Sequence, residues 1–126
     1  MRILIAEDDP LLADGLTRSM RGGEHAVDCV NDGAAADHAL STQTYDLAII
    51  DLGLPRMDGF ELTRLIKADV LLRSTPVMMI TYKEREEDRQ RGLRAGVDVF
   101  LTKSSFQDAS LDRKSTRLNS SHIPLS

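Results

Sequence analysis

Several residues that can take part in chemistry each follow an apolar run of the chain. They are a carboxylate pair, a single carboxylate, a hydroxyl and an ammonium: Asp8 with Asp9, Asp51, Thr81 and Lys103. Carboxylate oxygens are the ligands that Mg²⁺ prefers, and a carboxylate can also act as a nucleophile. A divalent metal, an ammonium and a hydroxyl can together offset the charge of a phosphoryl group. These residue types therefore indicate phosphoryl transfer to an aspartate.

The three aspartates need a cation between them if they lie close together. At 4 Å and an effective dielectric near 20, each pair of carboxylates repels by about 4 kcal/mol. Mg²⁺ is the expected counter-ion because it keeps several waters and often shares its ligand shell with a phosphate. Taken singly, each residue also has a plainer interpretation: Asp8 and Asp9 as a helix cap with an exposed neighbour, Thr81 as structural, and Lys103 as a surface lysine.

The elements that would bring these residues together alternate between short β-branched runs and stretches of helical period. Strands are predicted over 2–6, 26–30, 46–50, 77–80 and 97–101, and helices from Pro10 to about 22, over 33–40, from Asp58 through Ile66, over 83–96 and from Asp108. This alternation is typical of a parallel α/β sheet, in which the carboxyl ends of the strands share one edge. All of the candidate residues are expected at that edge.

Composition limits the class of protein. The chain has 126 residues, enough for one domain, and a net charge of −4, which argues against direct nucleic acid binding. No run approaches the roughly 20 apolar residues of a membrane span. The single cysteine and the lack of a signal sequence favour the cytoplasm.

Four motifs, AEDD, IIDLGLPRMDG, MMIT and FLTK, resemble the receiver domain of two-component response regulators over residues 1–111. The resemblance implies a flavodoxin-like, doubly wound sheet of five parallel strands in the order 2-1-3-4-5 with five helices. The N-terminal half, through the segments MRILIAEDDPLLADGL and YDLAIIDLGLPRMDG, resembles transcriptional regulators of the OmpR/PhoB type, which have winged-helix outputs. The KSSF segment after the last strand resembles receivers of chemotaxis hybrid kinases.

The resemblance also implies roles for individual residues. Asp51 would accept phosphate from a histidine kinase or phosphotransfer domain, and Thr81 and Lys103 would bind the phosphoryl group. Phe100 would be the aromatic switch residue. The Mg²⁺ ligands would be Asp8 (through water), Asp9, Asp51 and the Gly53 carbonyl. A homodimer could form through the face made by the helix over 83–96, the strand over 97–101 and the last helix.

The chain departs from the family pattern at three places. Ser104 replaces the usual proline after Lys103, so a trans bond is expected there. Tyr82 is bulkier than the small residue often found after the threonine, which predicts slower phosphotransfer or hydrolysis than in a Tyr82→Ala variant. Residues 112–126 look like translated adaptor or vector sequence, so the fifth helix is expected to be truncated and the tail irregular.

Two other functions remain open at this stage. The chain could be a degenerate or hybrid receiver that keeps the site residues but does not switch. It could also be a Mg²⁺-dependent phosphatase with an aspartyl-phosphate intermediate, although such enzymes usually carry a second aspartate where this chain has Gly53. The leading prediction is a phosphoacceptor signalling domain and not an enzyme.

Overall fold

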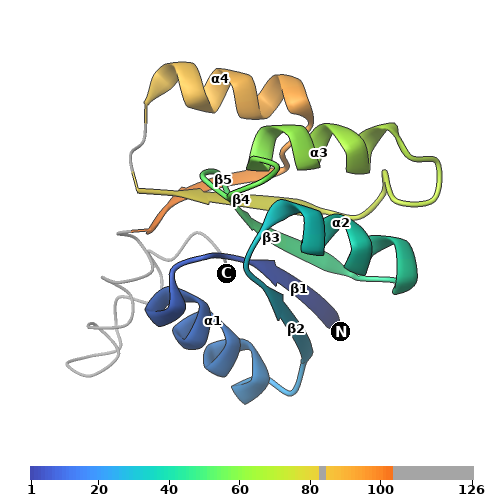
Figure 1. Cartoon of the computed structure of the whole chain (residues 1–126), viewed down its shortest axis with the longest axis vertical. Helices are drawn as coiled ribbons and strands as arrows, with labels where there is room; N and C mark the ends of the chain where they lie inside the picture. The colour runs from blue at the N-terminus through green and yellow to red at the C-terminus, as the bar shows by residue number, and fades with distance from the viewer. Residues whose placement is uncertain (83–84, 104–126) are drawn as a thin grey trace.

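The computed structural model describes residues 1–82 and 85–103 and contains a five-stranded parallel sheet in the order β2-β1-β3-β4-β5 (Figure 1). This confirms the predicted fold and strand order. The strands are β1 (Arg2–Ala6), β2 (Ala26–Val30), β3 (Leu47–Asp51), β4 (Val77–Thr81) and β5 (Val99–Thr102). The helices in the described part are α1 (Pro10–Gly22), α2 (Gly33–Thr42), α3 (Gly59–Ala68) and α4 (Glu86–Ala95).

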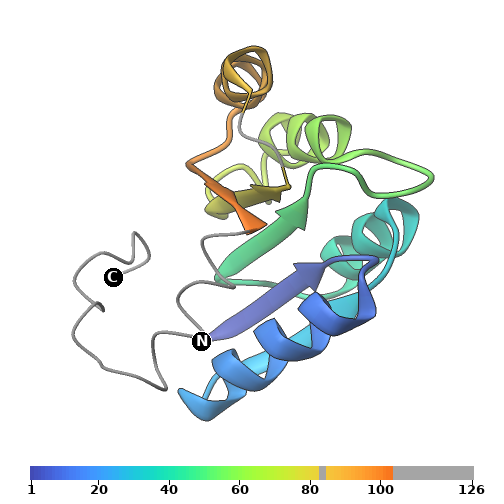
Figure 2. The ribbon, with the colours of Figure 1, turned by 90° about the vertical axis from the view of Figure 1, so that its left-hand side faces the viewer.

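The central strands β1, β3 and β4 are buried on both faces, which explains why they are nearly continuous apolar runs, whereas the edge strands β2 and β5 are partly exposed. Alternate residues of a strand point to opposite faces. In β1, Leu4 belongs to the core cluster that includes residues of α2 and α3, whereas Ile3 and Ile5 belong to the cluster that includes Leu16 of α1. Figures 1 and 2 show α1 on one side of the sheet, and α2 and α3 on the other with α4 beside α3.

Aspartate side chains cap the first three helices. Asp9, Asp32 and Asp58 each accept a hydrogen bond from a backbone N–H in the first helical turn, which stabilises the helix start. The interpretation of Asp9 as a helix cap is thus confirmed, and Asp58 caps the helix that was predicted to begin there. Helix α4 has no side-chain cap at Arg85, but its first turn is acidic. These carboxylates interact favourably with the positive end of the helix dipole and stabilise the helix start.

Some predicted element boundaries differ from those observed. The last strand was predicted over 97–101 but runs Val99–Thr102, because the amides of Gly96 and Val97 still bond back to the Gly92 carbonyl and complete the end of α4. Gly96 has φ 105, a backbone conformation that favours glycine. The predicted fifth helix, the tail over 112–126 and the bond to Ser104 lie outside the described residues. Among the described helices, none has the length and apolar character needed to cross a bilayer.

Candidate functional site

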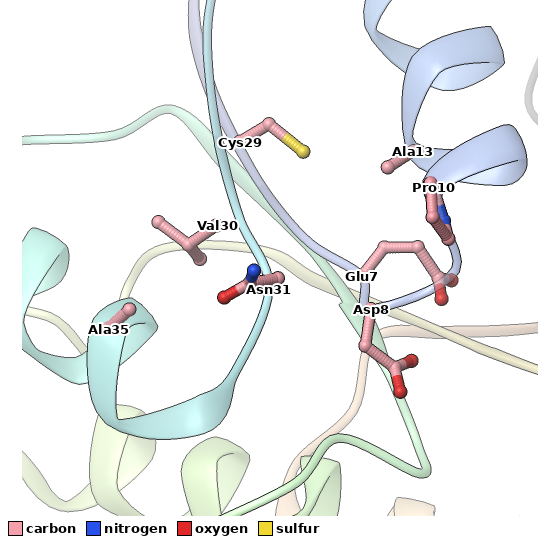
Figure 3. A pocket seen from close by; sticks show the side chains of 8 residues that line it. All are labelled: Glu7, Asp8, Pro10, Ala13, Cys29, Val30, Asn31 and Ala35. Carbon is pink, nitrogen blue, oxygen red and sulfur yellow. The ribbon is translucent and has the colours of Figure 1, made fainter.

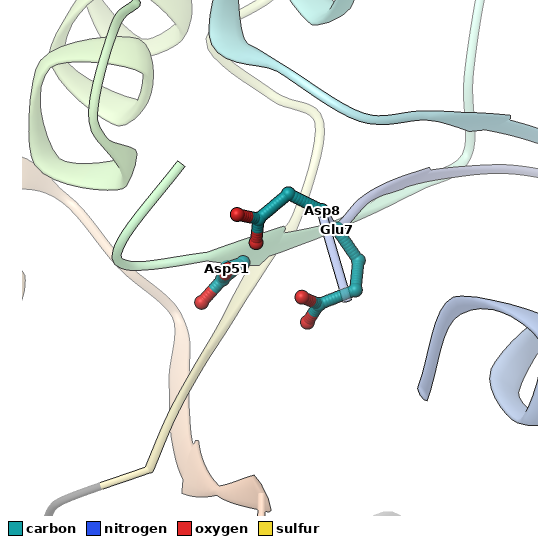
Figure 4. Close-up of side chains that lie close together, drawn as sticks. All are labelled: Glu7, Asp8 and Asp51. Carbon is teal, nitrogen blue, oxygen red and sulfur yellow. The ribbon is translucent and has the colours of Figure 1, made fainter. Parts of the chain in front are cut away.

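Three carboxylates meet at the carboxyl edge of the sheet and form what we call the acidic cluster: Glu7, Asp8 and Asp51 (Figure 4). Glu7 and Asp8 follow β1 directly, and Asp51 is the last residue of the neighbouring β3. One oxygen from each carboxylate lies within 4.8 Å of the others. Glu7 and Asp51 are 1% and 4% exposed, whereas Asp8 is exposed. The cluster therefore has two buried carboxylates and one that faces solvent.

Glu7 is buried because the backbone pairing of β1 extends one residue beyond the strand. Its amide donates to the Val30 carbonyl at 3.0 Å. Its Oε2 accepts from the Asp9 amide at 2.9 Å and from Lys103 Nζ at 3.2 Å. Its Oε1 lies 3.2 Å from the same Nζ but has no hydrogen-bond partner among the described residues. Burial raises the pKa of Glu7 to about 7, and the charge of Asp51 adds to this effect.

Lys103 supplies the positive charge that makes these buried carboxylates tolerable. Its Nζ lies 3.0 Å from Asp51 Oδ1, and the residue is only 2% exposed. Burial by itself lowers the pKa of Lys103, but the hydrogen bond and charge of Asp51, followed by those of Glu7, raise it above its usual value. The pKa of Asp51 is raised, mainly by burial, although Lys103 and the Gly53 amide act in the opposite direction. The ammonium is thus held in its charged form between two carboxylates.

Asp9, which was expected to be a metal ligand, lies outside the acidic cluster. Its Oδ1 accepts from the Leu11 amide at 3.1 Å, and its Oδ2 accepts from the Tyr82 hydroxyl at 2.6 Å. The structure therefore brings Glu7 and Asp8, not Asp8 and Asp9, beside Asp51. Sequence analysis missed Glu7. The signal lay in the helix cap itself: a carboxylate that caps the helix starting at Pro10 is turned toward the first helical turn.

The remaining expected residues lie around this edge. Thr81 ends β4, is 7% exposed, and pairs in register with Thr102, which precedes Lys103. The Gly53 amide donates to Asp51 Oδ1 at 3.2 Å, while a metal-binding role for its carbonyl stays a prediction. Phe100 is partly buried in β5, and a Cβ added at Gly92 would lie 3.0 Å from its ring. The Phe100 ring therefore lies against α4.

The connection between β3 and α3 holds the backbone of Asp51 in place. The Gly59 amide donates to the Leu52 carbonyl at 3.0 Å, and a Cβ at Gly59 would come within 2.8 Å of the Asp51 carbonyl oxygen. Only glycine permits so close an approach. The Gly33 amide also donates to the Pro55 carbonyl at 3.1 Å, which ties the start of α2 to this loop.

A pocket of about 470 Å³ opens beside the acidic cluster (Figure 3). Its lining combines two of the acids with small apolar and polar side chains from α1, β2 and α2: Glu7, Asp8, Pro10, Ala13, Cys29, Val30, Asn31 and Ala35. Of the two acids in this lining, Asp8 is exposed and Glu7 is buried.

The donor set fits Mg²⁺. Three carboxylates within 4.8 Å offer hard oxygen ligands, and a buried Glu7 oxygen has no hydrogen-bond partner among the residues described. Exposed Asp8 leaves room for coordinated water, which Mg²⁺ retains. The ammonium of Lys103 neutralises part of the charge but leaves the cluster negative.

Comparison with known proteins gives a consistent result. The family model described as "Response regulator receiver domain" matches residues 3–114. The response regulator protein PmrA of Pseudomonas aeruginosa is 45% identical over 103 residues, which are 82% of this chain and 46% of PmrA. The transcriptional regulatory protein TctD of Salmonella typhimurium is 39% identical over 114 residues, 90% of this chain and 50% of TctD. The chain thus spans about half the length of these relatives.

One solved structure with a similar fold is described with a bound magnesium ion. It is the receiver domain of the sensor histidine kinase PA1611 from Pseudomonas aeruginosa, described with magnesium coordinated in the active site cleft. It aligns with a TM-score of 0.75 and 30% identity, covering 89% of this chain and 94% of that domain.

Proposed function

Since the chain belongs to the response regulator receiver family, we propose that it accepts a phosphoryl group on Asp51 in a Mg²⁺-dependent reaction. The chain is a receiver domain of the two-component type. The observation that carries the proposal is the placement of buried Lys103 between Asp51 and Glu7, next to exposed Asp8. This arrangement combines a nucleophile, a fixed cation and metal ligands in one place.

We propose that Asp8 and Asp51, supported by Glu7, hold the Mg²⁺, with the Gly53 carbonyl as a further ligand. When bound, Mg²⁺ offsets negative charge on the oxygens of the transferred group. Glu7 also fixes the position of Lys103, because Oε2 accepts a hydrogen bond from its ammonium. Asp9 is assigned to the cap of α1 and not to the metal.

In the proposed step, a carboxylate oxygen of Asp51 attacks the phosphorus of a phosphohistidine on a histidine kinase or phosphotransfer domain. An O–P bond forms and the P–N bond breaks, with its electron pair remaining on the imidazole nitrogen. Lys103 Nζ, now 3.0 Å from Asp51 Oδ1, can transfer its hydrogen bond to a phosphoryl oxygen. We assign the Thr81 hydroxyl as a second donor to that group.

We propose that the added charge is transmitted through Phe100 to the face formed by α4 and β5. Displacement of the Phe100 ring from Gly92 would change how α4 sits, and with it the affinity for a second copy or another protein partner. The relatives PmrA and TctD are named as regulators, so a transcriptional output is proposed for a longer protein that carries this domain. The domain itself is proposed to act through proteins, since the whole chain has a net charge of −4.

The test is the intact mass of the protein after incubation with acetyl phosphate. With Mg²⁺ present, the wild type is expected to gain one phosphoryl group, and the gain is expected to disappear with EDTA. Asp51→Asn should show no gain, whereas Asp46→Asn, at the residue just before β3 begins, should behave as wild type. A folded wild type that gains no mass would instead identify a receiver that has lost phosphoacceptance.

A further inference from the structure

The start of α2 is packed against the loop that joins β3 to α3, residues 52–58, which we call the β3–α3 loop. Gly33, the first residue of α2, donates its amide to the Pro55 carbonyl at 3.1 Å. The first amides of a helix have no partner within the helix, so this carbonyl satisfies one of them. The Pro55 carbonyl also accepts from the Met57 amide at 2.8 Å. Pro55 is therefore held both by α2 and by its own loop.

The contact between α2 and the β3–α3 loop leaves no space for a side chain at Gly33. A Cβ added there would overlap the Met57 carbonyl oxygen and would come within 2.6 Å of Met57 Cβ. Met57 packs against the core cluster that also contains Leu54, which is 5% exposed. The loop therefore cannot move away from an added methyl group without disturbing the core.

Arg56 indicates that the β3–α3 loop is held in one particular conformation. Its φ is 70°, in the left-handed region that residues other than glycine adopt at an energetic cost. Arg56 lies between Pro55 and Met57, the two residues that contact Gly33. Its Nε also lies 3.3 Å from Asp32 Oδ2, but the Arg56 side chain is 72% exposed, so this ion pair contributes little. The backbone contacts of Gly33, and not the charge of Arg56, therefore hold the loop.

We propose that Gly33 is a positioning residue that sets the preference of the metal site for Mg²⁺ over Ca²⁺. This inference rests on the proposed function, in which the Gly53 carbonyl is a metal ligand. Gly53 lies between Asp51, to whose Oδ1 its amide donates at 3.2 Å, and the segment that Gly33 holds. Mg²⁺ requires a nearly ideal octahedron at about 2.0–2.1 Å, whereas Ca²⁺ accepts variable geometry at about 2.3–2.6 Å. A displaced carbonyl therefore weakens the binding of Mg²⁺ more than that of Ca²⁺.

The test is titration of isotope-labelled protein with MgCl₂ and, separately, with CaCl₂, followed through the NMR signals of the amides of residues 51–53. Gly33→Ala is expected to weaken Mg²⁺ binding about tenfold, as is typical when a group that orients a metal ligand is lost, and Ca²⁺ binding about threefold or less. Asp32→Ala removes the cap hydrogen bond from the Ala35 amide, 2.7 Å long, and so loosens the start of α2. It should shift the ratio of the two affinities in the same direction but less. Asp32→Asn keeps a capping oxygen and should restore the wild-type ratio.

Gly22→Ala is the matched control, because a Cβ at the end of α1 would meet nothing within 4 Å and should leave both affinities unchanged. Thermal melts in EDTA establish which variants are folded. A purely structural role for Gly33 would lower the melting temperature and leave the ratio of the Mg²⁺ and Ca²⁺ affinities as in the wild type, which would overturn the proposal. If Gly33→Ala does not fold, the ratio in Asp32→Ala decides in the same way. A folded wild type that binds no Mg²⁺ would instead overturn the proposed function and this inference with it.

Discussion

Glu7 is the residue on which the charge balance of the site depends. It is one of two buried carboxylates around Lys103, and it holds both the ammonium and the Asp9 amide through Oε2. Burial raises its pKa to about 7, so in the metal-free protein it binds and releases a proton near neutrality. A bound cation would favour the ionised form and remove this cost.

Mg²⁺ binding should therefore depend on Glu7 and much less on Asp9. Glu7→Gln is expected to weaken Mg²⁺ binding about tenfold, equivalent to about 1.4 kcal/mol, whereas Asp9→Asn should change it little. In the wild type, affinity should rise as the pH increases through about 7, because loss of the Glu7 proton frees the carboxylate. The pH dependence should be flatter in Glu7→Gln. Calorimetric titration with MgCl₂ measures both effects, and a larger loss in Asp9→Asn would contradict the assignment.

At the level of single residues, the sequence predicts part of the site. Asp51, Thr81 and Lys103 could be placed at one edge, because each comes at or just after the end of a strand. The choice among Glu7, Asp8 and Asp9 could not be made from residue types alone. It depends on one extra backbone pairing, from the Glu7 amide to Val30, and on the cap that turns Asp9 toward α1.

Among the elements, the turn from β3 to α3 leaves little room for an added side chain. Helix α3 begins at Gly59, directly against the backbone of Asp51 and Leu52. Its N-cap, Asp58, holds the first turn in place through the Glu61 amide at 2.9 Å. The position of the phosphoacceptor is therefore set by the helix that follows it as well as by its own strand.

Gly59→Ala should destabilise the domain by about 1–3 kcal/mol, because the added Cβ would meet backbone atoms at 2.8–2.9 Å. It should also slow phosphorylation by shifting Asp51. Gly15→Ala in α1 is the matched control: a Cβ there meets nothing within 4 Å, and alanine favours a helix by about 0.5–1 kcal/mol. Thermal melts and acetyl phosphate labelling test both. If Gly59→Ala melts no lower than Gly15→Ala, the close approach is not rigid.

Element order was easier to predict than element limits. Alternating β-branched and helical segments indicated the parallel sheet, and the strands were found in the predicted order. The start of the last strand was wrong by two residues, because apolar Val97 completes the end of α4 and does not begin β5. Apolar character alone does not distinguish a capping residue from a strand residue.

In the molecule as a whole, one buried cation connects segments that are distant in the chain. Lys103, directly after β5, contacts Glu7 after β1 and Asp51 at the end of β3. In the sheet, β1 lies next to β3, and β4 lies between β3 and β5. The contacts of Lys103 therefore connect the ends of strands from β1 to β5. A phosphoryl group on Asp51 would change the charge at this point and would also interact with Lys103. A reaction at Asp51 would therefore change contacts that connect distant segments of the domain.

The central claim is that Asp51, and no other carboxylate, carries the phosphoryl group. The most direct measurement is reductive trapping: the protein is labelled with acetyl phosphate and Mg²⁺, treated with borohydride, and mapped by peptide mass spectrometry. Reduction of an aspartyl phosphate leaves homoserine at the modified position. We predict homoserine at position 51 alone, and its absence when Mg²⁺ is withheld. Homoserine at position 8 or 9, or an unmodified Asp51 in protein that has gained phosphate, would contradict the account.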